Sequence, residues 1–167
     1  GFIKYFSKIF LEDFSILSFP ISLMNLYLTI SQFNFNFPFA SAKKTVTVAV
    51  LGDSMVDTLG ADLRLLRDRL SARYPGVAFD LLNYGVGATN IDYGLERVTN
   101  GYTYLGESKP SLASQKPDIV VVESFGYNPY TFDEGALDRH WLALAKIVDE
   151  LRANIPSVKI VIAATIA

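Results

Sequence analysis

The stretch VTVAVLGDSM, residues 46–55, decides how the rest of the chain is interpreted. It begins with apolar and β-branched residues, a composition typical of a strand buried in a sheet. Gly52, Asp53 and Ser54 follow, and the pattern beyond them is helical. An acid and a hydroxyl residue at a strand-to-helix junction either cap the helix or present chemistry beside its unpaired backbone N–H groups. These three residues alone leave both interpretations open.

Strand-like and helix-like segments alternate through residues 43–167. A leucine stripe over 59–76 and a long amphipathic segment over 133–156 predict helices. Such alternation implies right-handed crossovers between parallel strands that are covered on both faces. We therefore predict an α/β fold, a three-layer α/β/α sandwich with a parallel, flavodoxin-like sheet that ends after its fourth strand. The expected strands cover residues 45–52, 77–83, 118–124 and 158–167.

The composition limits the classes of function. The chain has 167 residues, 50% of them hydrophobic, with a net charge of -2, one histidine and no cysteine. This suffices for one globular domain, excludes disulfides and thiolate chemistry, and leaves no recognisable metal set. Basic residues are scattered among acidic ones, which argues against nucleic acid as a partner. We expect a small molecule or a neutral polymer instead.

Residues 1–42 form a hydrophobic leader that differs from the rest of the chain. Lys4 and Lys8 precede an apolar segment over 14–30, and FASA at 39–42 resembles a signal-peptidase site. Acidic residues and a proline interrupt the pattern, and the segment is short for a hydrocarbon core about 30 Å thick. The leader is either a signal peptide or membrane anchor, or a segment without such a role. The first alternative predicts an exported or membrane-anchored protein, and the second a cytoplasmic one.

Ligands of open parallel sheets collect at the carboxyl ends of the strands. Three expected loops lie there, at 52–55, 83–90 and 123–129, and each carries glycine and a short polar residue. The hydroxyl of Ser54, beside free N–H groups and a helix dipole, suits attack on an ester carbonyl, because such donors stabilise an oxyanion. In this interpretation Asp53 accepts backbone N–H groups and holds the shape of the loop.

The other two loops offer donors to the same oxygen. Gly85 and Gly87 permit a backbone whose N–H groups point inward, and Asn128 offers a side-chain amide. Each signal is weak alone, because glycine often only makes a turn and asparagine before proline often starts one. A dinucleotide-binding loop is disfavoured because Asn90 replaces the third glycine of G-x-G-x-x-G.

Further residues near these loops allow two interpretations each. Glu123, after the valine run, is either a buried acid that hydrogen-bonds the loops, which we favour, or a solvated strand end. Tyr127 and other tyrosines either line a substrate cleft or cover the core. Asp57 invites comparison with a phosphotransfer D-x-D-x-T loop, but Met55 occupies the position of the second acid.

The order of three motifs resembles the SGNH or GDSL hydrolase family. GDS at 52–54, NYGVGATN at 83–90 and GYN at 126–128 are similar to three of the four sequence blocks that mark this family. Pro129 stands where the family usually has aspartate. The resemblance covers residues 45–167 and implies a serine esterase or lipase without a cofactor. Its substrates would be carboxylic esters, such as acyl lipids or O-acetyl groups on polysaccharide, reached from a membrane tether if the leader is an anchor.

The resemblance also implies a role for each matching residue. Ser54 would be the nucleophile that forms an acyl-enzyme. The N–H of Ser54, a glycine N–H and the amide of Asn128 would bind the oxyanion. Because the loop is slightly shorter than the family pattern before its second glycine, Gly87 is the expected donor and Gly85 the reserve. Asp53, Gly85 and Tyr127 are expected beside the substrate.

A serine hydroxyl needs a general base, and the chain offers little for this role. His140 is the only histidine and lies within the helix expected over 133–156, at the wrong spacing from Asp138 for the family's Asp-x-x-His block. We interpret it as a helix-face residue. The resemblance then implies that the base lies outside this chain, which would be a poor esterase with an unpaired edge on its fourth strand. The alternatives are a non-catalytic binding or scaffold domain of the same fold and, less favoured, a nucleotide-binding domain.

Overall fold

The computed structural model describes residues 16–19, 45–126, 128 and 133–165. Most of the predicted leader lies outside these residues, and so does Tyr127. The expectation that Tyr127 contacts substrate therefore stays a prediction. Among the helices in the described ranges, none combines the length and apolar character that crossing a bilayer requires.

The core of the domain is a parallel sheet, as predicted. The strands are β2 (Thr45–Gly52), β3 (Ala78–Gly85), β6 (Ile119–Glu123) and β7 (Lys159–Thr165), paired in the order β3-β2-β6-β7. In chain order this is 2-1-3-4, the order of the first four strands of a flavodoxin-like sheet. The strand order reverses between β2 and β6, so the crevice at their carboxyl ends is the expected place for a ligand.

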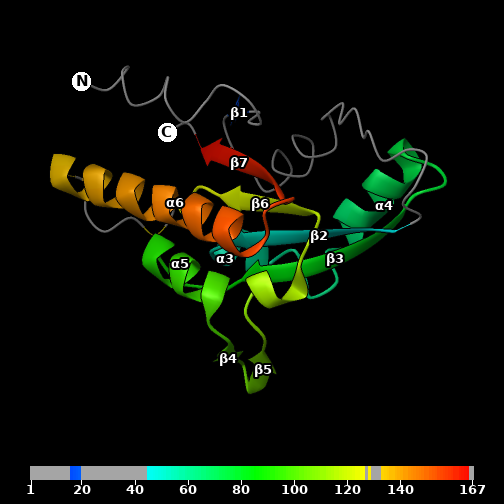
Figure 1. Ribbon diagram of the computed structural model, residues 1–167, viewed down its shortest axis with the longest axis horizontal. Coiled ribbons are helices and arrows are strands. Elements are labelled where there is room, and N and C mark those ends of the chain that lie inside the picture. The colour runs from blue at the N-terminus through cyan, green and yellow to red at the C-terminus, as the bar shows by residue number, and fades with distance from the viewer. Residues whose placement is uncertain (1–15, 20–44, 127, 129–132, 166–167) are drawn as a thin grey trace.

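Helices cover both faces of the sheet and complete three layers. Alternate residues of each strand face opposite sides, so the valines of β2 pack with α4 (Arg64–Arg73) while Ala49 and Leu51 face the other layer. That other layer contains α5 (Ile91–Thr99) and α6 (Glu134–Asn154), which lie side by side in Figure 1. Every residue of β6 is buried, which confirms that its valine run faces helices on both sides.

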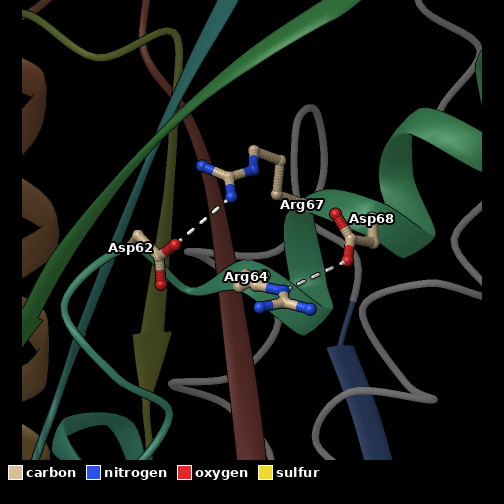
Figure 2. Close-up of polar contacts among 4 residues, drawn as sticks. All are labelled: Asp62, Arg64, Arg67 and Asp68. Atoms are coloured by element: carbon tan, nitrogen blue, oxygen red, sulfur yellow. Dashed lines mark hydrogen bonds and ion pairs between the residues drawn. The ribbon is translucent and has the colours of Figure 1, made fainter.

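The helix predicted over 59–76 is shorter than expected. A separate turn of helix, α3 (Ser54–Asp57), precedes it, and α4 begins only at Arg64 because Leu63 has a left-handed backbone with φ of 46°. On the outer surface, Arg67 pairs with Asp62 at 3.2 Å and Arg64 with Asp68 at 3.9 Å (Figure 2). These pairs are exposed, so each adds about 1 kcal/mol or less to stability.

Residues 100–117, which lie outside the predicted strands and helices, contain regular structure. β4 (Tyr102–Tyr104) and β5 (Glu107–Lys109) form an antiparallel hairpin that projects from the domain in Figure 1, and the short helix η1 (Ala113–Gln115) follows. Leu105 and Gly106, between the strands, both have positive φ, as tight two-residue hairpin turns require. Strands this short give no clear alternation in the sequence.

The sheet has a fifth strand that the sequence does not reveal. β1 (Ile16–Phe19) lies parallel to β7, with register partners from Ile162 to Thr165. The prediction that this edge of β7 is unpaired is therefore wrong. The physical reason is that an edge strand exposes unpaired N–H and C=O groups, which another extended segment can satisfy.

Gly85 provides a test of how tightly α3 is held against the sheet. A methyl group at this position would overlap the backbone N of Asp57 and lie 2.6 Å from the carbonyl carbon of Val56. We expect Gly85→Ala to lower the free energy of unfolding by about 1–3 kcal/mol or more, because backbone atoms must move. Chemical denaturation measures this change.

Gly135→Ala is the matched control, since a methyl group there would lie 3.2 Å from the Asp133 carboxylate and 3.5 Å from the Arg139 guanidinium, and would meet no backbone of another segment. This control should be neutral or slightly stabilising, since alanine favours a helix by up to about 1 kcal/mol over glycine. Equal losses for the two variants would contradict the close packing of α3 on β3.

Candidate active site

Ser54 begins α3 at the carboxyl end of β2, where the sequence predicts a nucleophile. Asp53 is the N-cap of this helix and is fully buried, and its carboxylate accepts the Met55 N–H at 2.8 Å. The capping interpretation is thus correct for Asp53, which leaves the side chain of Ser54 free for another role. Ser54 is partly exposed, and its hydroxyl has no hydrogen-bond partner in the described part of the chain.

Asn128 reaches this turn from the loop after β6. Its Nδ2 donates to Oδ2 of Asp53 at 2.9 Å, although the two residues are 75 positions apart in the chain. An amide nitrogen carries two hydrogens, so the second remains available for another acceptor. The structure therefore brings Asn128 to the residue next to Ser54, as the predicted site requires.

The glycine loop after β3 lies beside the same turn. Gly85 is the register partner of Gly52, and the N–H of Val86 donates to the Gly52 carbonyl at 3.2 Å. The two predicted glycine donors, however, already have partners. The Gly85 N–H donates to Oδ1 of Asn83 at 2.7 Å, and the Gly87 N–H to the hydroxyl of Tyr104 at 3.3 Å.

Ala88 is a residue that sequence reasoning missed. Its φ of 59° places it in the left-handed region, and its N–H has no acceptor among the residues that the structure describes. It is therefore an open N–H donor of this loop, directly after Gly87. The sequence gives no signal for it, because alanine is not expected where glycine fits best.

Asn83 and Gly85 have structural roles that explain their positions. The Asn83 amide donates to the carbonyls of Val56 at 3.0 Å and Gly60 at 2.8 Å, which ties α3 and the following turn to β3. Gly85 leaves the space into which the backbone of α3 fits. These contacts set the distance between α3, which begins at Ser54, and the glycine loop.

Arg97, on α5, is a second residue that the sequence did not single out. It is only 3% exposed, and its Nη2 donates to the Gly52 carbonyl at 2.9 Å while Nη1 donates to Oγ1 of Thr89 at 3.3 Å. Burial lowers its pKa to about 10, and the charge of Asp53 and the nearby tyrosines oppose that change. Arg97 therefore stays protonated at neutral pH and joins the end of β2 to the glycine loop.

Glu123 holds the same turn from β6. It is 2% exposed, its carboxylate accepts the Ser124 hydroxyl and the Phe125 N–H, both at 2.9 Å, and the backbone of Asp53 also hydrogen-bonds to it. The interpretation of Glu123 as a buried acid that hydrogen-bonds the loops is confirmed. Burial, with a smaller contribution from the Asp53 charge, raises its pKa to about 7 despite these hydrogen bonds. The Gly52–Asp53 peptide is thus held by Arg97 on its carbonyl and by Glu123 on its N–H.

Phe125 fixes the path of the loop that carries Asn128. It is fully buried with a φ of 53°, an unfavourable conformation for an aromatic residue. Its ring packs against Gly94 of α5, where a methyl group would lie 2.5 Å from the ring. The Asn128 N–H then donates to the Phe125 carbonyl at 3.2 Å, so this ring contact helps to place the Asn128 amide.

His140 lies on α6, as predicted. Its nearest interactions are a hydrogen bond with the backbone of Ser124 and the charge of Asp92, and burial lowers its pKa. Among the described residues, His140 makes no interaction with Ser54. Within the same ranges, no group of three or more candidate ligand residues is arranged to hold a metal ion.

Comparison with known proteins gives the fold but no sequence relative. No protein-family model matches the chain, and no curated protein matches its sequence. A solved two-domain esterase active on acetylated mannans is similar, at 18% identity and a TM-score of 0.54 over 74% of this chain and 30% of that one.

Two further structures match at the same level. One is a lipase/acylhydrolase from Enterococcus faecalis (19% identity, TM-score 0.50, 70% of this chain and 55% of that one). The other is Axe2, an acetylxylan esterase from Geobacillus stearothermophilus (22% identity, TM-score 0.51, 72% and 60%). The chain therefore spans between 30% and 60% of the length of these structures. It shares the α/β fold of these solved esterases and of the acylhydrolase.

The raised pKa of Glu123 predicts a pH-dependent stability. Its carboxyl titrates near 4.5 in the unfolded chain and near 7 in the folded one. Between these pH values the folded state keeps a proton that the unfolded state has lost. The contribution of Glu123 to the free energy of unfolding therefore falls as the pH rises from 4.5 to 7. The full change is about 3 kcal/mol, and denaturation at pH 5 and pH 8 measures most of it.

Glu123→Gln should remove this part of the pH dependence, although the variant is less stable overall because one acceptor oxygen is lost. Glu150→Gln, at an exposed position on α6, should keep the wild-type slope. If the free energy of unfolding of Glu123→Gln changes with pH as steeply as that of the wild type, the pKa of Glu123 is not raised.

Arg97 is predicted to be needed for the arrangement of the site. We expect Arg97→Met to lower the free energy of unfolding by about 1–3 kcal/mol, because Thr89 and the Gly52 carbonyl lose a charged donor and Asp53 loses a buried counter-charge. Arg97→Lys keeps the positive charge, so its free energy of unfolding should fall less than that of Arg97→Met. Arg69→Met, at an exposed position on α4, should change stability by less than about 0.5 kcal/mol. Denaturation curves of the three variants decide the matter, and an Arg97→Met protein as stable as the wild type would contradict the assignment.

Proposed function

We propose that this protein is a serine ester hydrolase of the SGNH type in which Ser54 forms an acyl-enzyme. The observation that carries the proposal is the hydrogen bond between Asn128 and Asp53, which supports an amide donor next to a serine whose hydroxyl is free. A capping aspartate, a partly exposed serine and a converging amide are more than a helix cap needs.

The reaction begins when Oγ of Ser54 attacks the ester carbonyl and a general base takes its proton. The carbonyl oxygen becomes an oxyanion that accepts hydrogen bonds from the N–H of Ser54, the second amide hydrogen of Asn128 and an N–H of the glycine loop. For the last donor we propose Ala88, because Gly87 donates to Tyr104. The alcohol leaves with the proton, and water then releases the acid from Ser54.

The general base has to come from outside the described residues. His140 is the only histidine and interacts with Ser124 instead. We propose that an Asp-x-x-His segment, as in the family that the motifs resemble, supplies the base and its acid. The 167-residue chain by itself should then turn over esters slowly or not at all.

Acetylated polysaccharides are the substrates that we favour, with acyl lipids as a second class. Two of the structural neighbours are esterases described as acting on acetylated mannans and acetylxylan. Export, or a membrane tether through residues 1–42, would bring such an enzyme to extracellular polysaccharide and remains part of this proposal. A non-catalytic binding domain is the second candidate, favoured by the absence of a base beside Ser54 among the described residues.

Covalent labelling tests the nucleophile directly. The chain is incubated with a fluorophosphonate, with and without imidazole as an external base, and the labelled peptide is mapped. We expect slow labelling at Ser54 that imidazole accelerates, because the proposed site holds donors for the phosphonyl oxygen and no base lies beside Ser54 among the residues that the structure describes.

Ser54→Ala is the control and should abolish the label, whereas Ser124→Ala, in the loop after β6, should retain it. Label at another residue, or equal labelling of Ser54→Ala, would reject Ser54 as the nucleophile. No labelling under any condition would favour the binding domain.

A further inference from the structure

Asp57, Tyr104 and Gly87 form a polar cluster that the proposed chemistry does not use. The Tyr104 hydroxyl donates to Oδ2 of Asp57 at 2.8 Å and accepts the Gly87 N–H at 3.3 Å. Gly87 has no side chain to cover the pair, and a methyl group there would lie 3.3 Å from both oxygens. Three segments far apart in the chain thus meet around one carboxylate.

This cluster lies beside the proposed nucleophile. Ser54 and Asp57 are the first and last residues of α3, and residues three apart project from the same side of a helix with Cβ atoms about 5–6 Å apart. On the other side, Gly87 directly precedes Ala88, the proposed N–H donor. A ligand whose ester bond lies at Ser54 would therefore also reach the carboxylate of Asp57.

The carboxylate of Asp57 has the properties of a binding group. It is half-buried, no cation of the described chain lies within ion-pair distance, and Tyr104 occupies only one of its oxygens. A carboxylate accepts hydrogen bonds from hydroxyl groups and repels anions. The Tyr104 hydroxyl keeps its proton, because the hydrogen bond to Asp57 raises its pKa.

The hairpin holds Tyr104 in a fixed position. Beside Tyr104, the ring of Tyr102 packs on that of Tyr84 at 6.1 Å and under the guanidinium of Arg97 at 5.8 Å. At the other end of the hairpin, the Tyr84 hydroxyl donates to the Pro110 carbonyl at 3.1 Å. A preformed site of this kind loses little conformational freedom when it binds a ligand.

We propose that Asp57 and Tyr104 form a specificity subsite that binds free hydroxyl groups of a neutral sugar ester and disfavours anionic esters. Asp57 accepts a sugar hydroxyl through its open oxygen, and Tyr104 orients the carboxylate and offers its ring edge to the sugar. The subsite rests on the proposed function for its meaning, because it selects which ester reaches Ser54. Its ligand chemistry is independent of the missing base.

Binding can be measured without turnover in the Ser54→Ala chain. We would titrate this chain with mono-O-acetyl-xylobiose, with peracetylated xylobiose and with 1-acetyl-glycerol-3-phosphate, and follow the backbone amide signals of Asp57, Gly87 and Ala88 by NMR. Mono-O-acetyl-xylobiose should bind and shift these signals. Peracetylated xylobiose lacks hydroxyl donors and the phosphate ester is repelled, so both should bind at least about tenfold more weakly.

Second substitutions identify the groups responsible. Asp57→Leu keeps the size and removes the acceptor, so the Kd for mono-O-acetyl-xylobiose should rise about tenfold or more. Asp57→Asn should retain part of this binding and relieve the discrimination against the phosphate ester. Tyr104→Phe should weaken binding less than Asp57→Leu. Asp62→Leu, at the exposed ion pair in Figure 2, should leave the Kd within about twofold.

The outcomes separate this inference from the proposed function. The subsite is rejected if no sugar ester binds, if peracetylated xylobiose binds as well as the mono-acetyl compound, or if Asp57→Leu leaves the Kd unchanged while its amide spectrum shows a folded protein. Binding as expected, combined with a Ser54 that no fluorophosphonate labels, would keep the subsite and reject the esterase. If fluorophosphonate labels Ser54 but Asp57→Leu leaves the Kd unchanged, the esterase proposal is kept and the subsite is rejected.

Discussion

The candidate site depends on one buried carboxylate. Asp53 is completely shielded from solvent, and its two oxygens bind groups from different parts of the chain, the Met55 N–H and the Asn128 amide. The first bond fixes the start of α3 and therefore the position of Ser54. The second draws the loop after β6 onto the end of β2, across the point where the strand order reverses. Without this residue, the turn at Ser54 and the amide of Asn128 would have no shared anchor.

A buried charge of this kind is tolerated only if its surroundings compensate for the loss of water. Arg97 supplies a positive charge from α5, and Glu123 is the other buried acid of the described chain. Burial, and to a smaller extent the Asp53 charge, raises the pKa of Glu123 to about 7. With Glu123 protonated, Asp53 and Arg97 balance each other. The same two neighbours bind the Gly52–Asp53 peptide, so the groups that neutralise the site also orient it. Arg97 and Glu123 therefore set both the charge balance around Asp53 and the orientation of its backbone.

The sequence predicted the features that follow from periodicity. Strand and helix patterns were enough for the parallel sheet and the carboxyl-edge position of Ser54 and Asn128, and the burial of Glu123 followed from the valine run before it. The hairpin, the left-handed residue Leu63 and the fifth strand were missed, because short strands and single backbone turns leave no periodic signal. Arg97 was missed for another reason: a charged residue in an amphipathic helix is expected to face solvent, and only the folded structure shows that it points inward.

Two of the positive-φ backbone positions lie in the loops beside Ser54. Among the described residues other than glycine, positive φ occurs at Leu63, Leu105, Lys116, Ala88 and Phe125. Ala88 and Phe125 stand in the two loops that converge on Ser54, at positions where glycine would relieve the strain. In the loop after β6, strain at Phe125 is held by a ring that fits only because Gly94 has no side chain, and the same loop delivers the Asn128 amide. The ring contact fixes the path that the backbone follows to Asn128, and the amide of Asn128 in turn donates to Asp53. The packing of one aromatic ring is thus coupled to the position of the amide beside Ser54.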